Sequence, residues 1–203
     1  MQFLTTLLLS ITILASNVST KEIPPMTGPH AEEYRSGAMH MQIMSLKFAT
    51  YSRNRDSGLY RNSQKWKPIK TLAKCQNGIA TTSTEDKFRC KNIDLAYFAS
   101  HADLGSVTGE GSSMWGWTAQ DGREFAAIGQ ADGAAFVEVE RNSGALVYLG
   151  RLPQPKGADP LIWREIRMLK NFAVIGSEAV GHGVQIFDMQ KVCTINPYLG
   201  IEF

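Results

Sequence analysis

Five side chains of the kinds used in ligand binding or catalysis lie in the C-terminal half of the chain. His182 stands between Gly181 and Gly183, and Glu178 precedes it by four residues. On a loop joining two strands, these side chains could face a bound molecule. The alternative is that 181–183 is a tight turn carrying a structural histidine, and we favour it. The full candidate set of ligand-facing residues is His182, Glu178, Glu165, Arg164 and Asp132.

Motifs of better-known chemistry are incomplete. The stretch 109–111 (GEG) lacks the Gly-Lys-Ser/Thr that follows in phosphate-binding loops. The stretch 111–113 (GSS) lacks the G-x-S-x-G spacing of a nucleophile elbow. No two of the 4 histidines have the spacing of metal ligands. We therefore expect no cofactor and no metal, and the catalytic residues stay unknown.

The charge balance excludes some classes of partner. The formal net charge is only +2, whereas binding to nucleic acid or to an anionic membrane surface requires concentrated Lys and Arg. Two function classes remain. The first is a non-catalytic binding or scaffold protein for an extracellular protein or carbohydrate. The second is an extracellular hydrolase or lyase whose site uses the five residues above.

The N-terminus has the profile of a signal peptide. The first 20 residues carry no charged side chain, and an apolar stretch runs from Phe3 to Ala15. We predict a signal peptide over 1–19, cut between Ala15 and Thr20; a short buried strand or helix is the alternative. The stretch is too short to span a membrane, and no second one follows. The chain is thus expected to be secreted, either free outside the cell or associated with the cell surface.

Export makes the cysteines candidates for disulfides. Cys75 and Cys90 are 15 residues apart (90 − 75), and a bridge closing such a loop stabilises by about 3 kcal/mol in the chain-entropy model. We predict that they pair and tie the N-terminal segment to the first strand of the main domain; two free thiols are the alternative. Cys193 is then left without a partner.

The rest of the chain divides by pattern. Residues 30–51 have helical spacing of apolar side chains, and 52–74 are polar and irregular, which indicates a solvated loop. From residue 88, short β-branched or aromatic runs alternate with Gly, Asp, Asn and Pro. We therefore expect a helical and irregular segment over 20–74 and a β domain over 75–203.

The β domain contains an internal repeat with a period near that of a propeller blade. Residues 125–129 (FAAIG) match 172–176 (FAVIG) at an offset of 47 (172 − 125), and 133–138 (GAAFVE) match 183–188 (GVQIFD) at 50 (183 − 133). Residues 148–150 and 198–200 (both YLG), and Trp115 and Trp163, extend the match. We predict an all-β fold: a partial β-propeller of two four-stranded units plus a leading strand, after a short N-terminal helical segment.

Several longer motifs give this region a family resemblance. They are 90–95 (CKNIDL), 109–118 (GEGSSMWGWT), 121–133 (DGREFAAIGQADG), 148–153 (YLGRLP), 163–166 (WREI) and 181–188 (GHGVQIFD). Over residues 34–191 the chain resembles the LVIVD-repeat proteins, in particular the secreted choice-of-anchor B-like group with fungal members called regulatory P domain-containing proteins. The resemblance implies an exported or surface-displayed β-propeller. It implies no catalytic residues, because the family has no established mechanism.

The end of the chain departs from the family pattern. A closed propeller needs at least about four blades, and two units fit between residues 107 and 203. Val192-Cys193 can be encoded by GTATGT, a common fungal splice-donor sequence. We therefore expect a truncated form of a longer protein, with 192–203 an aberrant tail from a translated intron. The second YLG at 198–200 speaks for a genuine tail, in which case two units suffice, for example by dimerising.

Overall fold

The structure is a computed structural model that describes residues 27–59, 65–195 and 201–202. The predicted signal peptide lies outside the described residues. The chain divides into two compact units, 1–49 and 50–203. Within the described part, no helix is both long and apolar enough to cross a membrane.

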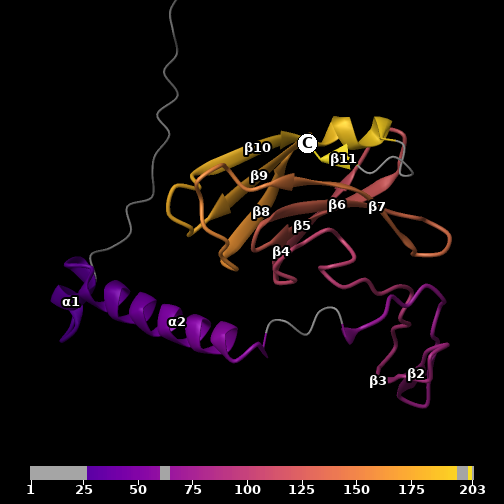
Figure 1. The fold of residues 1–203 in the computed structure, drawn as a ribbon, viewed down its shortest axis with the longest axis horizontal. Helices are drawn as coiled ribbons and strands as arrows, with labels where there is room; N and C mark the ends of the chain where they lie inside the picture. Colours follow the sequence, from indigo (N-terminus) through magenta and orange to yellow (C-terminus); the bar gives the residue numbers. More distant parts are fainter. Residues whose placement is uncertain (1–26, 60–64, 196–200, 203) are drawn as a thin grey trace, which may run out of the picture. The chain divides into compact units, whose positions relative to one another are not determined.

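The described part of the first unit is helical, as the spacing predicts. Helix α1 (Ala31–Arg35) and helix α2 (Ala38–Asp56) are separated by two residues, and α2 continues into the second unit (Figure 1). The expectation of a solvated loop over 52–74 is therefore wrong at its start. It is also wrong further on, because Ile69 and Ala73 form isolated bridges with Phe98 and Leu95 and are buried.

A small three-stranded sheet follows these bridges. It comprises β1 (Cys75–Gln76), β2 (Ile79–Thr81) and β3 (Lys87–Arg89), in the order β1-β2-β3. Asn77 and Gly78 both have positive φ, 52° and 82°, which is the backbone of the tight turn joining β1 to β2. The predicted disulfide between Cys75 and Cys90 is present, with Cα atoms 5.8 Å apart.

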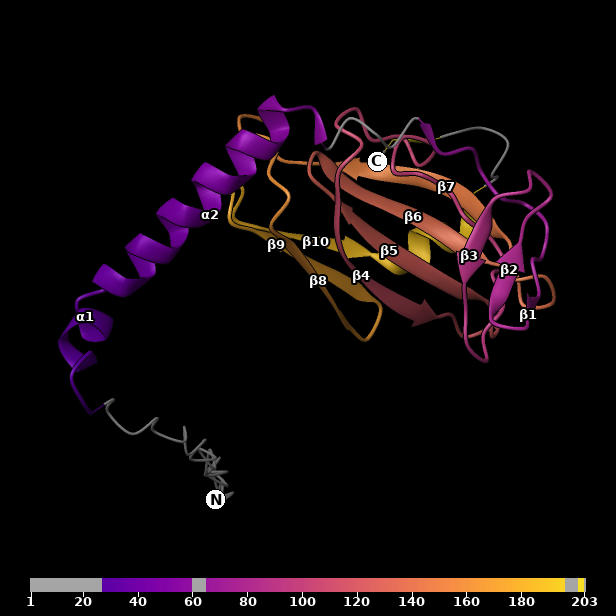
Figure 2. The ribbon, with the colours of Figure 1, turned by 90° about the horizontal axis from the view of Figure 1, so that it is seen from below.

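The disulfide connects different elements from those predicted. Cys75 begins β1 and Cys90 directly follows β3, so the bond closes the small sheet on itself. It does not join the N-terminal segment to a strand of the main domain. Figure 2 shows β1, β2 and β3 beside one another, as the strands of a separate sheet. The spacing of the two cysteines indicated a closed loop, but it could not indicate which strands that loop contains.

The larger sheet contains five strands. They are β4 (Gly111–Thr118), β5 (Glu124–Gln130), β6 (Gly133–Val139), β7 (Leu146–Pro153) and β11 (Ile201–Glu202). The spatial order is β11-β7-β6-β5-β4; β4 to β7 form an antiparallel meander, whereas β11 runs parallel to β7. The first repeat therefore supplies four consecutive antiparallel strands, as predicted.

The second repeat supplies a three-stranded antiparallel sheet in the described residues. It contains β8 (Arg164–Leu169), β9 (Phe172–Ser177) and β10 (Val184–Asp188), and the 3₁₀ helix η2 (Met189–Thr194) follows directly. The match expected to supply a fourth strand, 198–200, lies outside the described residues. The next described strand, β11, pairs with β7 and not with β10.

Strand register confirms that the two repeats are equivalent. Phe125 faces Glu138 across β5 and β6, and Phe172 faces Asp188 across β9 and β10. These pairs reproduce the offsets of 47 (172 − 125) and 50 (188 − 138). The match of Trp115 to Trp163 is wrong, however. Trp115 of β4 faces the middle of β5, and Arg167 of β8 faces the middle of β9. Arg167 is therefore the equivalent of Trp115, whereas Trp163 lies before the beginning of β8.

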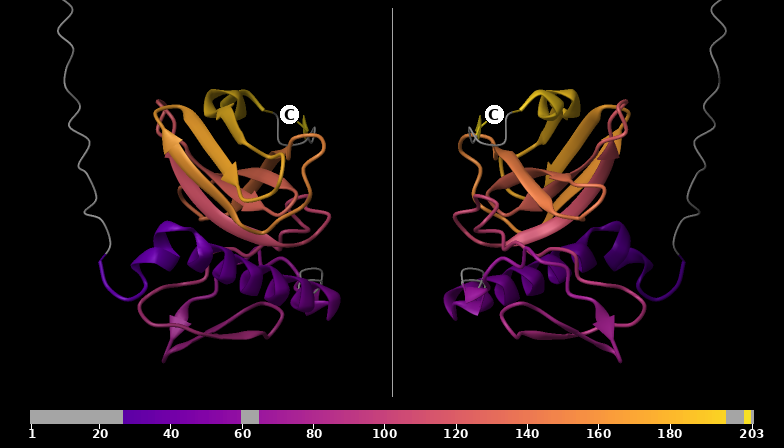
Figure 3. Two further views of the ribbon diagram at one scale, coloured as in Figure 1. Left: turned by 90° about the vertical axis from the view of Figure 1, so that its left-hand side faces the viewer. Right: turned by 90° about the vertical axis from the view of Figure 1, so that its right-hand side faces the viewer.

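The two larger sheets pack face to face, and the main core lies between them (Figure 3). Phe136 of β6 stacks on Phe187 of β10 with ring centroids 4.3 Å apart. Met189 and Val192 of η2 are buried in the same core, and Cys193 and Ile195 pack against it, so the beginning of the segment 192–203 is packed. The origin of this segment stays a prediction. The chain is an all-β protein with a short helical segment, and its described strands do not form a closed propeller.

Candidate functional site

Arg164 is buried at the beginning of β8, where the two large sheets meet. Its Nε donates to the carbonyl oxygen of Gln130 at 2.8 Å, and Nη2 donates to the carbonyl oxygen of Ala131 at 3.3 Å. Nη1 forms a short hydrogen bond with Nε2 of His182. The guanidinium therefore links β8 to the end of β5 and to the loop before β10, which makes it a joint between the two repeats.

His182 is buried and uses both of its ring nitrogens. Nδ1 lies 2.9 Å from the carbonyl oxygen of Gly183, a group that can only accept a hydrogen bond. Because Arg164 can only donate, Nε2 must accept and Nδ1 must carry the proton. The imidazole is thus a neutral tautomer committed to the turn at 181–183, and it has no nitrogen available to take a proton from a substrate.

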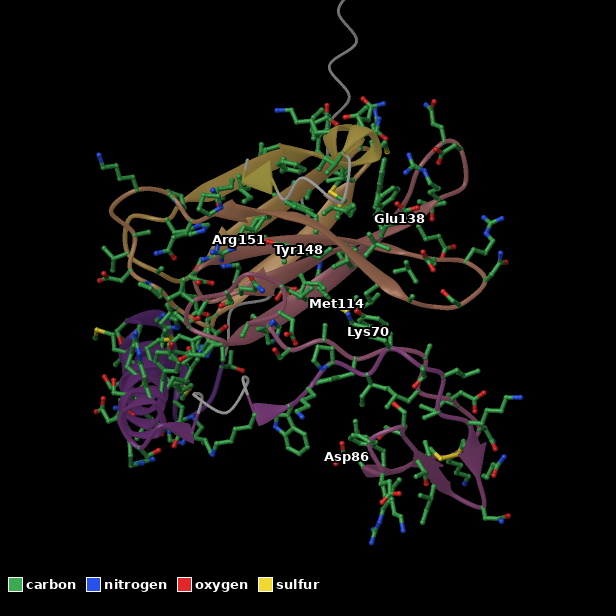
Figure 4. All side chains as sticks on the ribbon, turned by 45° about the vertical axis from the view of Figure 1, so that its right-hand side comes forward. Lys70, Asp86, Met114, Glu138, Tyr148 and Arg151 are labelled. Carbon is green, nitrogen blue, oxygen red and sulfur yellow. A yellow bond between two sulfur atoms is a disulfide. The ribbon has the colours of Figure 1, made fainter. Side chains whose placement is uncertain are left out.

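Both carboxylate oxygens of Asp132 likewise accept hydrogen bonds from other parts of the fold. Its Oδ1 accepts from Arg151 Nη2 at 2.8 Å and from Ser106 Oγ at 2.9 Å, and Oδ2 accepts from the backbone N–H of Val107 at 2.7 Å. Arg151 comes from β7, where Figure 4 shows it near Tyr148. The carboxylate therefore fixes the loop before β4 against the turn between β5 and β6.

Burial also sets the electrostatics of this joint. Desolvation lowers the pKa of Arg164 to about 10, with Arg151 contributing in the same direction and Asp132 opposing. Arg164 therefore remains a cation at neutral pH.

Desolvation also lowers the pKa of His101, against the opposing effect of Asp132. The ring of His101 lies over Gly111, where a Cβ would come within 1.8 Å of its Nε2, so only glycine is compatible with this packing.

The two remaining predicted residues, Glu165 and Glu178, are exposed. Glu165 pairs with Arg167 at 2.6 Å between Oε1 and Nη1. Both glutamates border a hollow of about 420 Å³, which we call the carboxylate hollow. Its lining residues are Ser112, Trp163, Arg164, Glu165, Gly176, Ser177 and Glu178. The structure thus brings Arg164, Glu165 and Glu178 to one place, but His182 and Asp132 do not line it.

A second hollow, of about 410 Å³, was not predicted from the sequence. It is mainly apolar, with aromatic side chains and a few polar ones, and we call it the aromatic hollow. Its lining residues are Leu59, Trp66, Lys67, Ile69, Asp86, Phe88, Phe98, Ala99, Ser100, His101 and Gly109. A signal was present, because Trp66 stands alone in a polar stretch and is still largely exposed in the structure.

The aromatic hollow is assembled from segments that are distant in sequence. Ile69 and Phe98 pair across an isolated bridge, and β3 contributes Phe88. The disulfide fixes the end of β3, because Cys90 follows Arg89 directly. The small sheet therefore supplies one wall of the hollow, and residues 98–101 supply another.

In the part of the chain that the structure describes, no three His, Cys, Asp or Glu side chains are placed to hold a metal ion. No family model, curated protein or solved structure matches this chain. The function is therefore inferred from the geometry of the two hollows and of the joint.

Proposed function

We propose that the chain is a secreted or cell-surface, non-catalytic binding or scaffold protein built on two consecutive units of an LVIVD-type β-propeller. The first strands of the two units, β4 and β8, lie side by side, as the innermost strands of neighbouring blades do. Ser112 Oγ donates to the carbonyl oxygen of Arg164 at 2.8 Å, and Ser113 Oγ accepts from the N–H of Ile166 at 2.9 Å. The equivalent register of the two repeats supports the same architecture.

The aromatic hollow is the observation on which the binding function rests. Small-molecule sites are concave, mostly apolar and of about 300–1,000 Å³, with a few polar groups that orient the ligand. The hollow has this size and composition, with aromatic walls from Trp66, Phe88 and Phe98. Lys67, Asp86 and His101 provide the polar groups. An aromatic side chain of a peptide or the apolar face of a sugar would fit such walls.

The non-catalytic character follows from how the polar side chains are used. Arg164, His182 and Asp132 are the groups best suited to acid–base or charge chemistry, and all three are bonded to other parts of the fold. If these bonds were broken, buried polar groups would lose their partners, and each such group would lower the stability of the fold by about 1–3 kcal/mol. Arg164, with His182 bonded to it, therefore holds the two repeats together, whereas Asp132 fixes loops of the first repeat.

One observation favours a second candidate, an extracellular hydrolase or lyase. Two carboxylates and one buried cation border the carboxylate hollow. Assays of the secreted chain with nitrophenyl esters and nitrophenyl glycosides test this candidate. If turnover is found and is lost in both Glu165→Gln and Glu178→Gln variants that remain folded, the enzyme replaces the binding protein as the proposed function.

The binding function is tested with a fluorescent probe, 1-anilinonaphthalene-8-sulfonate, which combines aromatic rings with an anionic group. We expect Trp66→Ala to weaken probe binding at least about tenfold, because it removes the largest aromatic side chain that lines the hollow. Trp115→Ala is the matched control, since Trp115 is an exposed tryptophan outside the hollow. Equal binding by the wild type and the Trp66→Ala variant would contradict the assignment.

A further inference from the structure

Equivalent positions of the two repeats differ sharply in exposure. In the first sheet, Phe125, Ala134 and Phe136 are 2%, 1% and 0% exposed. Their equivalents in the second sheet, Phe172, Val184 and Ile186, are 44%, 65% and 68% exposed. These three residues, with Leu169, lie on the side of β8–β10 that faces away from the core. We call this side the outer face.

The first repeat shows what such a face contacts. There, the equivalent residues pack against the opposite side of the second sheet, through Ile166, Ala173, Ile175 and Phe187. Positions of this kind are thus sites of sheet-on-sheet contact, with side chains from the two faces interdigitating. In the second repeat the same positions keep large apolar residues, although no described element covers them. With Leu169, four large apolar side chains are gathered on one sheet face, and such a patch marks an interaction surface.

We propose that the outer face of β8–β10 binds the outer face of a second copy of this chain, which gives a twofold dimer. The charges on this face permit such contact. Glu165 and Arg167 form an ion pair on it, so they contribute no net charge that would repel a second copy. Asp188, at the end of β10, accepts from the N–H of Gln190 as the cap of η2. This proposal uses the repeat equivalence and does not depend on either hollow.

The rest of the molecule explains why association should stop at two copies. A head-to-tail chain would need the far side of the first sheet to receive the outer face of the next copy. That side is already covered, since Ala126, Ala135 and Val137 are buried with Leu104 packed over them. Among the described residues, β8–β10 thus offers a large apolar face without a partner, and pairing two such faces closes the assembly.

The size of the face sets the expected strength. Three strands of five or six residues measure about 14 Å by 17 Å, from the usual strand spacing and rise per residue. Two such faces bury less than the roughly 1,200 Å² of standard stable interfaces. The dimer should therefore be concentration-dependent, with a dissociation constant in the micromolar range.

Sedimentation of the full chain at about 1 to 200 µM tests the proposal. We expect the wild type to shift from one to two monomer masses over this range, and Ile186→Glu to remain monomeric. Met114→Glu is the matched control and should behave as the wild type. Met114 is an exposed apolar strand residue of similar exposure, 58%, and it lies on β4, outside the outer face (Figure 4).

Circular dichroism establishes that Ile186→Glu is folded, and Val184→Lys provides a second disruption of the same face if it is not. A wild type that stays monomeric at 200 µM would overturn the proposal. Dimerisation of folded Ile186→Glu and Val184→Lys with wild-type affinity would also overturn it.

Discussion

The two large sheets share a sequence pattern and a register, yet the same positions do opposite things in each. In β4–β7 the matched apolar residues form the main core with the second sheet, whereas in β8–β10 they are exposed. Within the described residues, the second sheet also has three strands where the first repeat supplies four. A repeat therefore specifies which residues contact a neighbouring sheet, and the presence of that neighbour decides whether they become core or surface.

The largest effect is expected from equivalent substitutions at the centre of this comparison. Phe136→Ala should lower the free energy of unfolding by about 3–5 kcal/mol, because it leaves a cavity beside Phe187. Ile186→Ala, at the equivalent position, should lower it by less than about 1 kcal/mol at low protein concentration. Urea unfolding at 1 µM measures both values. Equal losses in the free energy of unfolding would show that the difference in burial between the two positions has no effect on stability.

The next effect concerns the joint between the repeats. Arg164→Ala should cost about 3 kcal/mol, since His182 and two carbonyl oxygens lose a buried donor. Arg167→Ala, three residues along the same strand, removes an exposed ion pair and should cost less than about 1 kcal/mol. Thermal unfolding compares the two variants. A small loss for Arg164→Ala would mean that the hydrogen bonds of its guanidinium contribute little to holding the two sheets together.

The disulfide should have a local effect. Replacing Cys75 and Cys90 by Ser removes a loop constraint of about 3 kcal/mol, and that loop contains only the small sheet. We expect faster hydrogen exchange over 75–90 and unchanged exchange in β5 and β6. Cys193→Ser is the control, because this thiol is free. Faster exchange throughout both large sheets would show that the small sheet supports the whole second unit.

The smallest effect should be a pH dependence from His101. Its pKa is lowered by burial, so below pH 6.5 the unfolded chain binds a proton that the folded chain excludes. Stability should therefore fall as the pH decreases from 6.5 towards the lowered pKa of the folded state. His101→Phe keeps a ring over Gly111 and should reduce this slope. If stability depends on pH in the same way in the variant, titration of other groups causes the dependence.

Sequence reasoning succeeded where the information is local or repeated. The offsets of 47 and 50 predicted the equivalent strands, because residues on one face of a strand recur with its register. It failed for Trp163, since a single matched residue cannot show where a strand begins. Equivalent positions also need not share a role, since Asp188 caps η2 whereas its equivalent Glu138 contacts Arg123.

The candidate site was only partly accessible from the sequence. His182 and Arg164 were both among the candidate ligand-facing residues, but the sequence did not predict their mutual hydrogen bond, which spans 18 residues and two elements. The aromatic hollow was missed, because Trp66, Phe88 and Phe98 come from separate segments with no common spacing. Such contacts depend on where the small sheet packs against the segments around Trp66 and Phe98. No local sequence pattern encodes that packing.

The central claim is that equivalent positions form core in one repeat and a docking surface in the other. The most direct test is urea unfolding of the wild type, Phe125→Ala and Phe172→Ala at 1 and 200 µM protein. Because dimer formation stabilises the folded state by mass action, the wild-type midpoint should rise with concentration. Phe125→Ala should lower the midpoint at both concentrations and keep the rise, whereas Phe172→Ala should lose only the rise. A wild-type midpoint independent of concentration, or equal losses for both variants at 1 µM, would contradict the account.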